Sequence, residues 1–371
     1  MKILIAQDYL RSGGTERQSV LLANAFAAAG HATTLLTFRP GGALAGTVSD
    51  AVTHRVLQPF DLRLDWLAPR LLATARHLAP DVVLCMGRMA NCYAASLQAA
   101  LPAACVIGSM RTGKPLPALF RRSLRTVRHI VANSRDARDT LVARYSVPAG
   151  KISVIYNSLV FPADGANAAT ARDTLRREHG ATIRTRVLLC VAMFRPEKNQ
   201  RELVEIVAGL PEQLDWQLWL AGDGPARAAC ERLVTEKNLG ARVKFLGFHR
   251  DPTPHYRAAD LAVHASWSEA LSNFLIEGQA HGLLAVAYEA QGIRECFLPG
   301  RTGWAIARDD RAAFRATLSR RISEPQIAHD DRAAEARAFA RTTFDPARQV
   351  TAHLDLFAAL TSNLPSSPSV R

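Results

Sequence analysis

Short, strongly hydrophobic runs alternate with amphipathic stretches along almost the whole chain. The first two runs are MKILIAQ and ATTLLTF, on either side of a predicted helix over residues 18–29, and DVVLCM, ACVIGS, HIVANS and ISVIY follow. Runs without polar alternation are typical of parallel strands that are buried on both faces. The pattern therefore predicts an α/β fold, with parallel sheets covered by helices.

A polar segment rich in Ala, Gly and Pro, residues 161–173, interrupts the alternation. The pattern then restarts with VLLCVAMF, QLWLAGDG, RVKFLG, ADLAVHAS, LLAVAYE and GWAIA. Because 371 residues suffice for two domains, we predict two doubly wound domains, 1–162 and 163–345, joined by a linker in this segment. We expect the last helix, within 346–371, to pack back on the first domain, and the tail SNLPSSPSVR to be disordered.

The stretch 266–295, SWSEALSNFLIEGQAHGLLAVAYEAQGIRE, carries the most informative spacing, because seven residues separate Glu269 from Glu277. Residues 259–265 predict a buried strand, and residues 273–281 predict a helix. Glu269 is then expected in the loop between them, and Glu277 on the helix. Spacing alone leaves a second interpretation open, in which both glutamates are ordinary acids on a helix surface.

The start of this predicted helix is a candidate anion site. Ser272 is expected as its N-cap and Gly282 as its stop. The backbone amides around Asn273 and Phe274 would lie at the carboxyl edge of a parallel sheet, where phosphate groups commonly bind. With one carboxylate on either side, the site would suit a ligand that carries hydroxyl groups on both sides of its phosphates.

Two cations, Arg195 and Lys198, follow the first strand of the second domain in the segment MFRPEKNQ. At the carboxyl end of that strand they could clamp a diphosphate and stabilise the charge that develops on it as a leaving group. The alternative is a surface loop with two exposed cations.

Gly13 and Gly14 lie between the first strand and the first helix, in DYLRSGGTERQ. Glycines at this place either cradle a phosphate or form a flexible lip. The segment contains neither GxGxxG nor the Walker GK[ST] sequence, which disfavours dinucleotide-binding and P-loop proteins.

The formal net charge is +13, and the first 160 residues carry most of it. They contain 19 Lys and Arg against 8 Asp and Glu, a balance of +11, whereas the remaining residues contain 27 against 25, a balance of +2. Residues 116–131, LPALFRRSLRTVRHIV, predict a basic amphipathic helix. Such a helix can bind an anionic membrane surface, bind an acidic partner or simply be solvated. Nucleic acid is disfavoured, because no aromatic and basic platform accompanies the charge.

The six cysteines form no CxxC pair and no cluster with histidine, so we predict neither a zinc site nor a disulfide framework. Free thiols in a reducing cytoplasm fit this pattern. Gln7 and Asp8 interrupt the N-terminal hydrophobic run, so no signal peptide is expected. The chain also has no DxD motif, and we predict neither a bound metal ion nor another cofactor.

Several motifs together resemble glycosyltransferase family four, whose members are retaining enzymes of the GT-B fold. In order they are GGTER, VANS, VIYNS, RPEKN, LAGDGP, FLGF, the pair Glu269 and Glu277, and GIRE. The resemblance runs from the first residue to about residue 360. It implies two Rossmann-like domains that face a central cleft, with residues 1–162 on the acceptor side and residues 163–345 binding a nucleotide-sugar donor.

The resemblance also implies roles for the residues singled out above. Glu269 would contact hydroxyl groups of the donor sugar and Glu277 the ribose, whereas Arg195 and Lys198 would bind the diphosphate. Glu269, Arg195 and Lys198 form the predicted catalytic set. Further donor contacts would come from Gly13, Gly14, Gly247, Phe248, Ser272, Asn273 and Phe274.

The chain departs from the family pattern in three places. Met193 stands where the family has an arginine, so Arg195 would have to reach the phosphate from two positions later. In the segment GLLAVAYEAQG, Leu284 replaces a typical proline and Gln291 stands where a first glycine is common. No histidine matches the one in the first domain of many members, and Arg88 and Arg111 are candidates there to bind an acidic acceptor, or else surface salt-bridge partners.

The resemblance implies a retaining glycosyltransferase that uses a nucleotide sugar, with UDP preferred, and glycosylates a lipopolysaccharide core or another surface-glycan or lipid-linked acceptor. Such an enzyme would act at the cytoplasmic face of the inner membrane, held peripherally by the basic segment 116–131. Two alternatives stay open. One is a nucleotide-sugar epimerase of the GT-B fold, and the other is a non-catalytic, membrane-associated assembly factor that has kept a nucleotide pocket.

Overall fold

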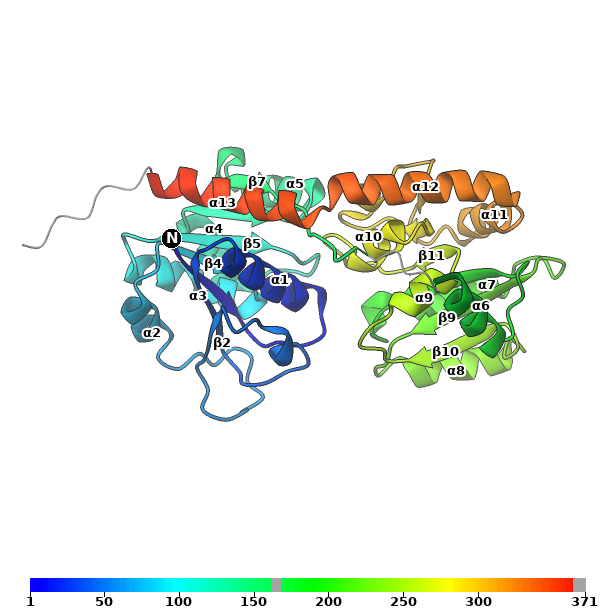
Figure 1. Cartoon of the computed structure of the whole chain (residues 1–371), viewed down its shortest axis with the longest axis horizontal. Coiled ribbons are helices and arrows are strands. Elements are labelled where there is room, and N and C mark those ends of the chain that lie inside the picture. Colours follow the sequence, from blue (N-terminus) through cyan, green and yellow to red (C-terminus); the bar gives the residue numbers. More distant parts are fainter. Residues whose placement is uncertain (162–167, 363–371) are drawn as a thin grey trace, which may run out of the picture. The chain divides into compact units, whose positions relative to one another are not determined.

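The computed structural model describes residues 1–161 and 168–362 and divides the chain into two compact units (Figure 1). Unit 1 consists of residues 1–158 and 346–371, and unit 2 of residues 159–345. Each unit is built on a parallel sheet with helices packed against it. The predicted α/β class, with two doubly wound sheets, is therefore confirmed.

The described strands of unit 1 form one parallel sheet in the order β3-β2-β1-β4-β5-β6-β7. They are β1 (Lys2–Gln7), β2 (Ala32–Thr37), β3 (Thr53–Val56), β4 (Val82–Cys85), β5 (Cys105–Met110), β6 (His129–Ala132) and β7 (Ile152–Val154). Strands β4 and β5 are buried along their whole length, which explains why their sequences are apolar without alternation.

Helices cover both faces of this sheet. The helices of unit 1 are α1 (Gly14–Ala28), η1 (Ala45–Thr47), α2 (Leu71–Leu78), α3 (Arg88–Ala100), α4 (Ala118–Thr126), α5 (Arg135–Tyr145), η2 (Ala149–Lys151) and α13 (Pro346–Ser362). Side chains of α2, α3, α4 and α5 form one apolar core with the sheet, and those of α1 and α13 form another. In the second core Phe26 of α1 packs edge-on against Phe357 of α13, and both are fully buried.

The described strands of unit 2 form a second parallel sheet in the order β10-β9-β8-β11-β12-β13. They are β8 (Arg186–Val191), β9 (Trp216–Ala221), β10 (Val243–Gly247), β11 (Leu261–His264), β12 (Leu284–Tyr288) and β13 (Gly303–Ile306). The helices are α6 (Ala168–Glu178), η3 (Pro196–Lys198), α7 (Gln200–Val207), α8 (Arg227–Glu236), α9 (Thr253–Ala258), α10 (Asn273–Ala280), η4 (Ile293–Cys296), α11 (Arg311–Ile322) and α12 (Gln326–Thr343).

The direction of winding reverses once in each sheet. In unit 1, β1 leads through α1 to β2 on one side, while β4 leads through α3 to β5 on the other. In unit 2, β8 leads to β9 and β11 leads to β12 in the same manner. The loops that leave the carboxyl ends of such neighbouring strands diverge and make room for a ligand. We call these places the β1/β4 and β8/β11 switch points.

Two predicted segments are corrected by the structure. Residues 116–131 do not form one helix, because α4 spans Ala118–Thr126, Val127 is already extended, and His129–Ala132 is strand β6. Val131 and its neighbour Ile130 are β-branched and join the buried ladder, which ends the helix early. The predicted linker, 161–173, is likewise helical from residue 168 in α6, and residues 162–167 lie outside the described part of the chain, as does most of the predicted disordered tail.

Candidate functional site

The β8/β11 switch point brings Lys198 and Glu269 into contact. Lys198 ends η3 in the loop after β8, and Glu269 lies in the loop after β11. The Nζ atom of Lys198 is 2.6 Å from Oε1 of Glu269, so the two form a hydrogen-bonded ion pair. The fold thus joins two predicted site residues that are 71 positions apart in the sequence.

Backbone contacts tie these two loops to each other. The hydroxyl of Ser266 and the amide of Trp267 both donate to the carbonyl oxygen of Glu197, at 3.0 and 3.1 Å. Because Glu197 immediately precedes Lys198, these bonds set the position of the ammonium relative to Glu269. The ion pair is therefore held from the main chain as well as from its side chains.

A glycine of the GIRE segment closes the loop from the other side. Gly292 has a φ of +73°, and a Cβ at this position would overlap the carbonyl of Ala270. Only glycine combines this left-handed backbone with so close an approach. Close packing of Gly292 against the loop that carries Glu269 therefore explains the glycine of the motif GIRE.

Glu269 is buried, with 9% of its surface exposed, and is ionised at neutral pH. Burial acts to raise the pKa of Glu269, but Lys198 and His264 outweigh burial and hold this pKa at about 2. Nε2 of His264 lies 2.9 Å from the same Oε1 oxygen. The sequence-based prediction gave His264 no place in the site, although a polar residue that ends a buried strand at a switch point was an available signal.

Glu277 lies on α10 and is oriented by a buried tyrosine of α9. The hydroxyl of Tyr256 donates to Oε2 of Glu277 at 2.6 Å. The ring of Tyr256 stacks on His281, with centroids 4.9 Å apart and an interplanar angle of 15°. Tyr256 is a second site residue that the sequence-based prediction missed, because nothing local to it indicates a partner on another helix.

The start of α10 has the predicted cap. Oγ of Ser272 accepts a hydrogen bond from the amide of Leu275 at 3.4 Å, and Gly282 follows the helix with a φ of +84°. Asn273 and Phe274 are the first two residues of the helix. This geometry places a helix N-terminus, with its partial positive charge, in the loop that begins at Glu269.

Arg195 and Met193 both lie on the loop after β8, and both side chains are exposed. The amide of Arg195 donates to the carbonyl of Met193 at 2.8 Å, which makes a tight turn before η3. Arg195 therefore neighbours Lys198 in a single loop, but it makes no described contact with Glu269 or Glu277.

Steric constraints explain the two glycines of the segment LAGDGP. Gly222 and Gly224 have φ values of +141° and +146°, and a Cβ on either would overlap the carbonyl of Ala192 or Phe194. They allow the turn after β9 to pack directly against the loop after β8. The amide of Gly222 also donates to the carbonyl of Gly247 at 2.7 Å, and Phe248 next to it is 57% exposed.

The β1/β4 switch point of unit 1 is arranged differently. Asp8, just after β1, accepts hydrogen bonds from the amides of Met89 and Ala90 at the start of α3, at 3.0 and 2.7 Å. Burial raises the pKa of Asp8 to about 6, against the opposing effect of these two bonds. A Cβ on Gly87 would overlap the carboxylate, so this glycine makes room for Asp8. The carboxylate of Asp8 thus occupies the place at the start of α3 where an external anion could otherwise bind.

The other predicted residues of unit 1 lie around this point. Gly13 is the N-cap residue of α1 and Gly14 its first residue, with the side chain of Glu16 against Gly13. Arg88, the first residue of α3, is exposed and donates to the carbonyl of Pro115 at 2.7 Å. Arg111 follows β5 directly and donates to Oδ1 of Asn157.

The basic segment of unit 1 exposes charge but little apolar surface. Phe120 and Leu124 of α4 are buried in the core, and only Leu119 among its large apolar residues is exposed. The cations exposed on this segment are Arg121, Arg122, Arg125 and Arg128. Within the described ranges, no helix combines the length and the hydrophobicity that crossing a membrane requires.

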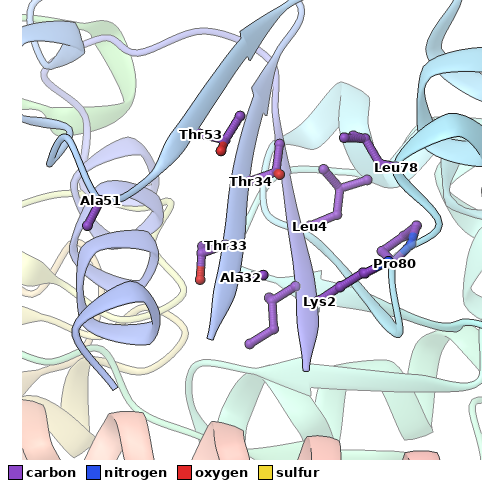
Figure 2. Close-up of a pocket in the computed structure, with 10 residues that line it drawn as sticks. Lys2, Leu4, Ala32, Thr33, Thr34, Ala51, Thr53, Leu78 and Pro80 are labelled. Atoms are coloured by element: carbon purple, nitrogen blue, oxygen red, sulfur yellow. The ribbon is translucent and has the colours of Figure 1, made fainter. Parts of the chain in front are cut away.

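A surface pocket lies at the opposite edge of the unit 1 sheet. Figure 2 shows it between the amino ends of β1 and β2, lined by Lys2, Ala32 and Thr33 among others. Ligands of open parallel sheets bind at the carboxyl edge. The candidate site is therefore the β8/β11 switch point and not this pocket.

Two family models match the chain. Residues 12–159 match the model described as Glycosyltransferase Family 4, and residues 185–324 match the one described as Glycosyl transferases group 1. Together these ranges cover more than half of the chain and include every predicted site residue.

Curated relatives match over part of their length. The chain is 30% identical to the putative glycosyltransferase EpsD of Bacillus subtilis over 186 residues, which is 50% of this chain and 48% of EpsD. It is 28% identical over 141 residues to the lipopolysaccharide core biosynthesis glycosyltransferase LpsE of Rhizobium meliloti, which is 38% of this chain and 41% of LpsE. The chain thus spans about half the length, or less, of these relatives.

Solved structures match over nearly the whole chain. Anabaena HepE in complex with UDP aligns with a TM-score of 0.81 at 21% identity, covering 97% of this chain and 100% of that one. A glycosyltransferase from Rickettsia africae aligns with a TM-score of 0.81 at 18% identity, covering 98% and 99%. These likenesses show that the two sheets together make a GT-B fold.

Proposed function

The chain belongs to glycosyltransferase family four, and on that premise we propose that it transfers a sugar from a nucleotide sugar to an acceptor, with retention of anomeric configuration. The observation that carries the proposal is the ion pair of Lys198 and Glu269, with His264 on the same carboxylate, at the β8/β11 switch point. This is the edge at which a sheet of this kind binds its ligand.

Each residue of the ion pair has a separate task. Glu269, held ionised by Lys198, is a strong acceptor for hydroxyl groups of the donor sugar. The ammonium of Lys198 has three N–H donors, and Glu269 engages one of them. Lys198 and the neighbouring Arg195 stabilise the charge that grows on the diphosphate as the bond to the sugar breaks. The acceptor hydroxyl attacks from the same face of the sugar.

The remaining donor contacts surround this pair. Glu277, oriented by Tyr256, binds the ribose hydroxyls. Backbone amides of Ser272, Asn273 and Phe274 bind the phosphate nearest the sugar. Gly247, Phe248, Gly13 and Gly14 complete the donor site. UDP is the proposed nucleotide, and the solved complex of HepE with UDP-glucose is in keeping with this choice. We propose that neither a metal ion nor another cofactor takes part.

The proposed acceptor is a lipopolysaccharide core or another surface glycan or lipid-linked glycan, as the name of LpsE suggests for that relative. The exposed arginines of α4 would hold the enzyme peripherally at the cytoplasmic face of the inner membrane by attraction to anionic lipid. Because the apolar side of α4 is buried, we propose surface attraction and not insertion of this helix.

Donor binding tests the proposal most directly. Titration of UDP-, GDP- and ADP-sugars by calorimetry should show one preferred nucleotide. Glu277→Gln should weaken its binding about tenfold, since a charged hydrogen-bond acceptor becomes neutral. The matched control is Glu231→Gln on α8, whose carboxylate pairs only with Arg227 in the described structure. Unchanged affinity in Glu277→Gln, or no binding of any nucleotide sugar, would contradict the proposed site.

Measurements of turnover distinguish a glycosyltransferase from the two alternatives, an epimerase and a non-catalytic assembly factor. A sugar product formed without any acceptor would indicate an epimerase, and donor binding without turnover on any membrane extract would indicate an assembly factor. Transfer of labelled sugar to a membrane glycan, with the anomeric configuration kept, is the result expected of a retaining glycosyltransferase.

A further inference from the structure

The loop of residues 57–70, which connects β3 to α2 in unit 1, exposes a cluster of large apolar side chains. Phe60, Leu62 and Trp66 are 65%, 41% and 57% exposed, and Val56 at the end of β3 is exposed as well. Elsewhere in the described ranges, exposed side chains of this kind lie singly along the chain. Single exposed apolar residues are common on protein surfaces, whereas a group of them marks an interaction surface.

One buried arginine determines the shape of this loop. Arg39, which follows β2, donates to the carboxylate of Asp61 at 2.8 and 2.9 Å and to that of Asp65 at 2.6 Å. Because both aspartates of the loop meet at one guanidinium, the chain folds back on itself between them. Their outer neighbours, Phe60 and Trp66, are thereby brought to the same end of the loop.

Further hydrogen bonds anchor the loop to the rest of unit 1. The amide of Gln58, a buried side chain, donates to the carbonyls of Leu64 and Leu67 at 2.8 and 2.7 Å. The hydroxyl of Tyr93 on α3 donates to the carbonyl of Trp66 at 2.6 Å. A backbone that is already ordered loses little conformational freedom when its side chains enter an apolar phase, so the entropic cost of binding is small.

The accessible charge of the loop is positive. Its two acids, Asp61 and Asp65, pair with arginines that follow β1 and β2. The arginines at positions 55, 63 and 70 are all exposed. The exposed surface of the loop thus combines apolar side chains with cations, which suits a partner that is both apolar and anionic.

The loop and the basic helix α4 belong to the same side of unit 1. Side chains of α2, α3 and α4 form one core on one face of the sheet, and α3 packs against both α2 and α4. Trp66 is bonded to α3, as described above. Helix α4 presents exposed arginines while Phe120 and Leu124 are buried, so the loop supplies the apolar surface that α4 lacks.

We propose that the loop 57–70 docks on an anionic lipid surface, with Phe60, Leu62 and Trp66 in the interfacial layer of the bilayer and Arg63 and Arg70 at its headgroups. Aromatic side chains favour this layer, and anionic lipid attracts arginine. Apolar burial and electrostatic attraction add to each other in such contacts. The inference rests on the proposed membrane location of the enzyme, and it assigns the apolar part of the anchoring to a segment outside α4.

Cosedimentation of the full chain with vesicles tests the docking without any donor or acceptor. The vesicles contain phosphatidylcholine and about one third phosphatidylglycerol. The double variant Phe60→Ala with Trp66→Ala should bind about twentyfold more weakly, about fivefold for each ring that no longer leaves water. The matched control Ile183→Ala, which removes an exposed apolar side chain of unit 2, should bind like the wild type. The melting temperature should stay unchanged in both variants, because these side chains are exposed.

Two further variants separate insertion of the loop from attraction by α4. Arg121→Gln with Arg125→Gln should weaken binding to the anionic vesicles only, whereas the double variant of the loop should also weaken binding to pure phosphatidylcholine. Trp66→Phe keeps an aromatic ring and should bind within about twofold of the wild type. It should nevertheless lose most of the quenching of tryptophan fluorescence by lipids that are brominated in their acyl chains.

Wild-type affinity of the double loop variant for the anionic vesicles, or quenching that survives in Trp66→Phe, overturns the proposal. Absence of vesicle binding by the wild type overturns it as well, and a dimer that only the loop variant loses would then assign the loop to a second copy of the chain. Lys198→Ala should bind vesicles like the wild type, so failure of the proposed transfer reaction and failure of the docking give different results.

Discussion

The two switch points of this molecule share a strand topology, but they have opposite effects on the pKa of the carboxylate that each of them holds. At the β8/β11 switch point a carboxylate, Glu269, is held by a lysine and a histidine. At the β1/β4 switch point the carboxylate of Asp8 is held by two backbone amides at the start of α3, Met89 and Ala90. The first arrangement lowers the pKa of its acid, and the second leaves the pKa of its acid raised.

This difference shows that a helix start at a switch point is not by itself an anion site. The start of α3 is already occupied by a side chain of the same chain, so an anion from outside would have to displace Asp8. The start of α10 is capped by the short side chain of Ser272, which engages the amide of Leu275. We therefore expect an external anion to bind more readily at the start of α10 than at the start of α3.

The largest expected effect comes from Lys198→Ala, which leaves Glu269 as a buried carboxylate without its strongest counter-charge. We expect sugar transfer to fall by about a hundredfold or more, because in the proposed reaction the leaving group also loses its cation. Unit 2 should lose about 3 kcal/mol of stability, as when one partner of a buried pair is removed. Steady-state transfer rates and urea unfolding measure the two effects.

The control for this experiment is Lys237→Ala, which removes an exposed lysine that pairs with Glu205 at 3.6 Å. The double variant Lys198→Ala with Glu269→Gln should recover stability but not activity. If the double variant were as unstable as the sum of its parts, the coupling between the two side chains would be refuted.

The second effect is a pH dependence of opposite sign in the two units. Asp8 binds its proton more tightly when folded, with a pKa of about 6 against an ordinary 3.8, so its contribution to stability is lost as pH rises from about 4 to 6. Glu269 ionises more readily when folded, with a pKa of about 2 against 4.5, so its contribution is lost as pH falls from about 4.5 to 2. Each is on the order of 2–3 kcal/mol.

Hydrogen exchange resolved by peptide, measured from pH 3 to 7 with correction for intrinsic rates, reads each unit separately. Asp8→Asn should flatten the dependence for peptides of β1 and α3 only, and Glu269→Gln for peptides of β11 and α10 only. A matching change in both units for either variant would mean that the two acids are not independent.

The smallest effect concerns the two helix starts themselves. Ser272→Ala removes an N-cap and should cost about 1 kcal/mol in unit 2. Asp8→Ala leaves two buried amides unpaired and should cost about 2 kcal/mol in unit 1 at neutral pH, less the relief of a buried charge. If the two substitutions reduced the free energy of unfolding equally, a local cap and a cap supplied from another strand would not differ in their contribution to stability. Chemical denaturation followed by exchange at α10 and α3 distinguishes them.

Local signals predicted much of unit 2. The apolar run at 259–265 becomes β11 over Leu261–His264, and the predicted helix 273–281 is α10, with Ser272 as its cap. These features depend on residues within one turn or one strand of each other, which a sequence displays directly. The positions of Arg195 and Lys198 in the loop after β8 followed from the same local pattern.

Contacts between distant segments could not be predicted in this way. Asp8 reaches Ala90 across 82 positions, and Tyr256 reaches Glu277 from a different helix. Such contacts depend on the order of strands in the sheet, which no short pattern specifies. Helix α12 was missed for another reason, since its buried positions include Ala333, Ala336 and Ala340, and alanine gives a weak apolar stripe.

Because α13 packs back on unit 1, it determines the order in which the two units can complete their folding during synthesis on the ribosome. Unit 2 is one continuous stretch, whereas unit 1 lacks Phe357, and with it part of a core, until the last segment of the chain has been made. Domains usually complete folding in the order of synthesis. Here the unit that is translated first is the one that finishes last, and a messenger cut short before codon 346 would yield a complete unit 2 beside an N-terminal unit with an open apolar face.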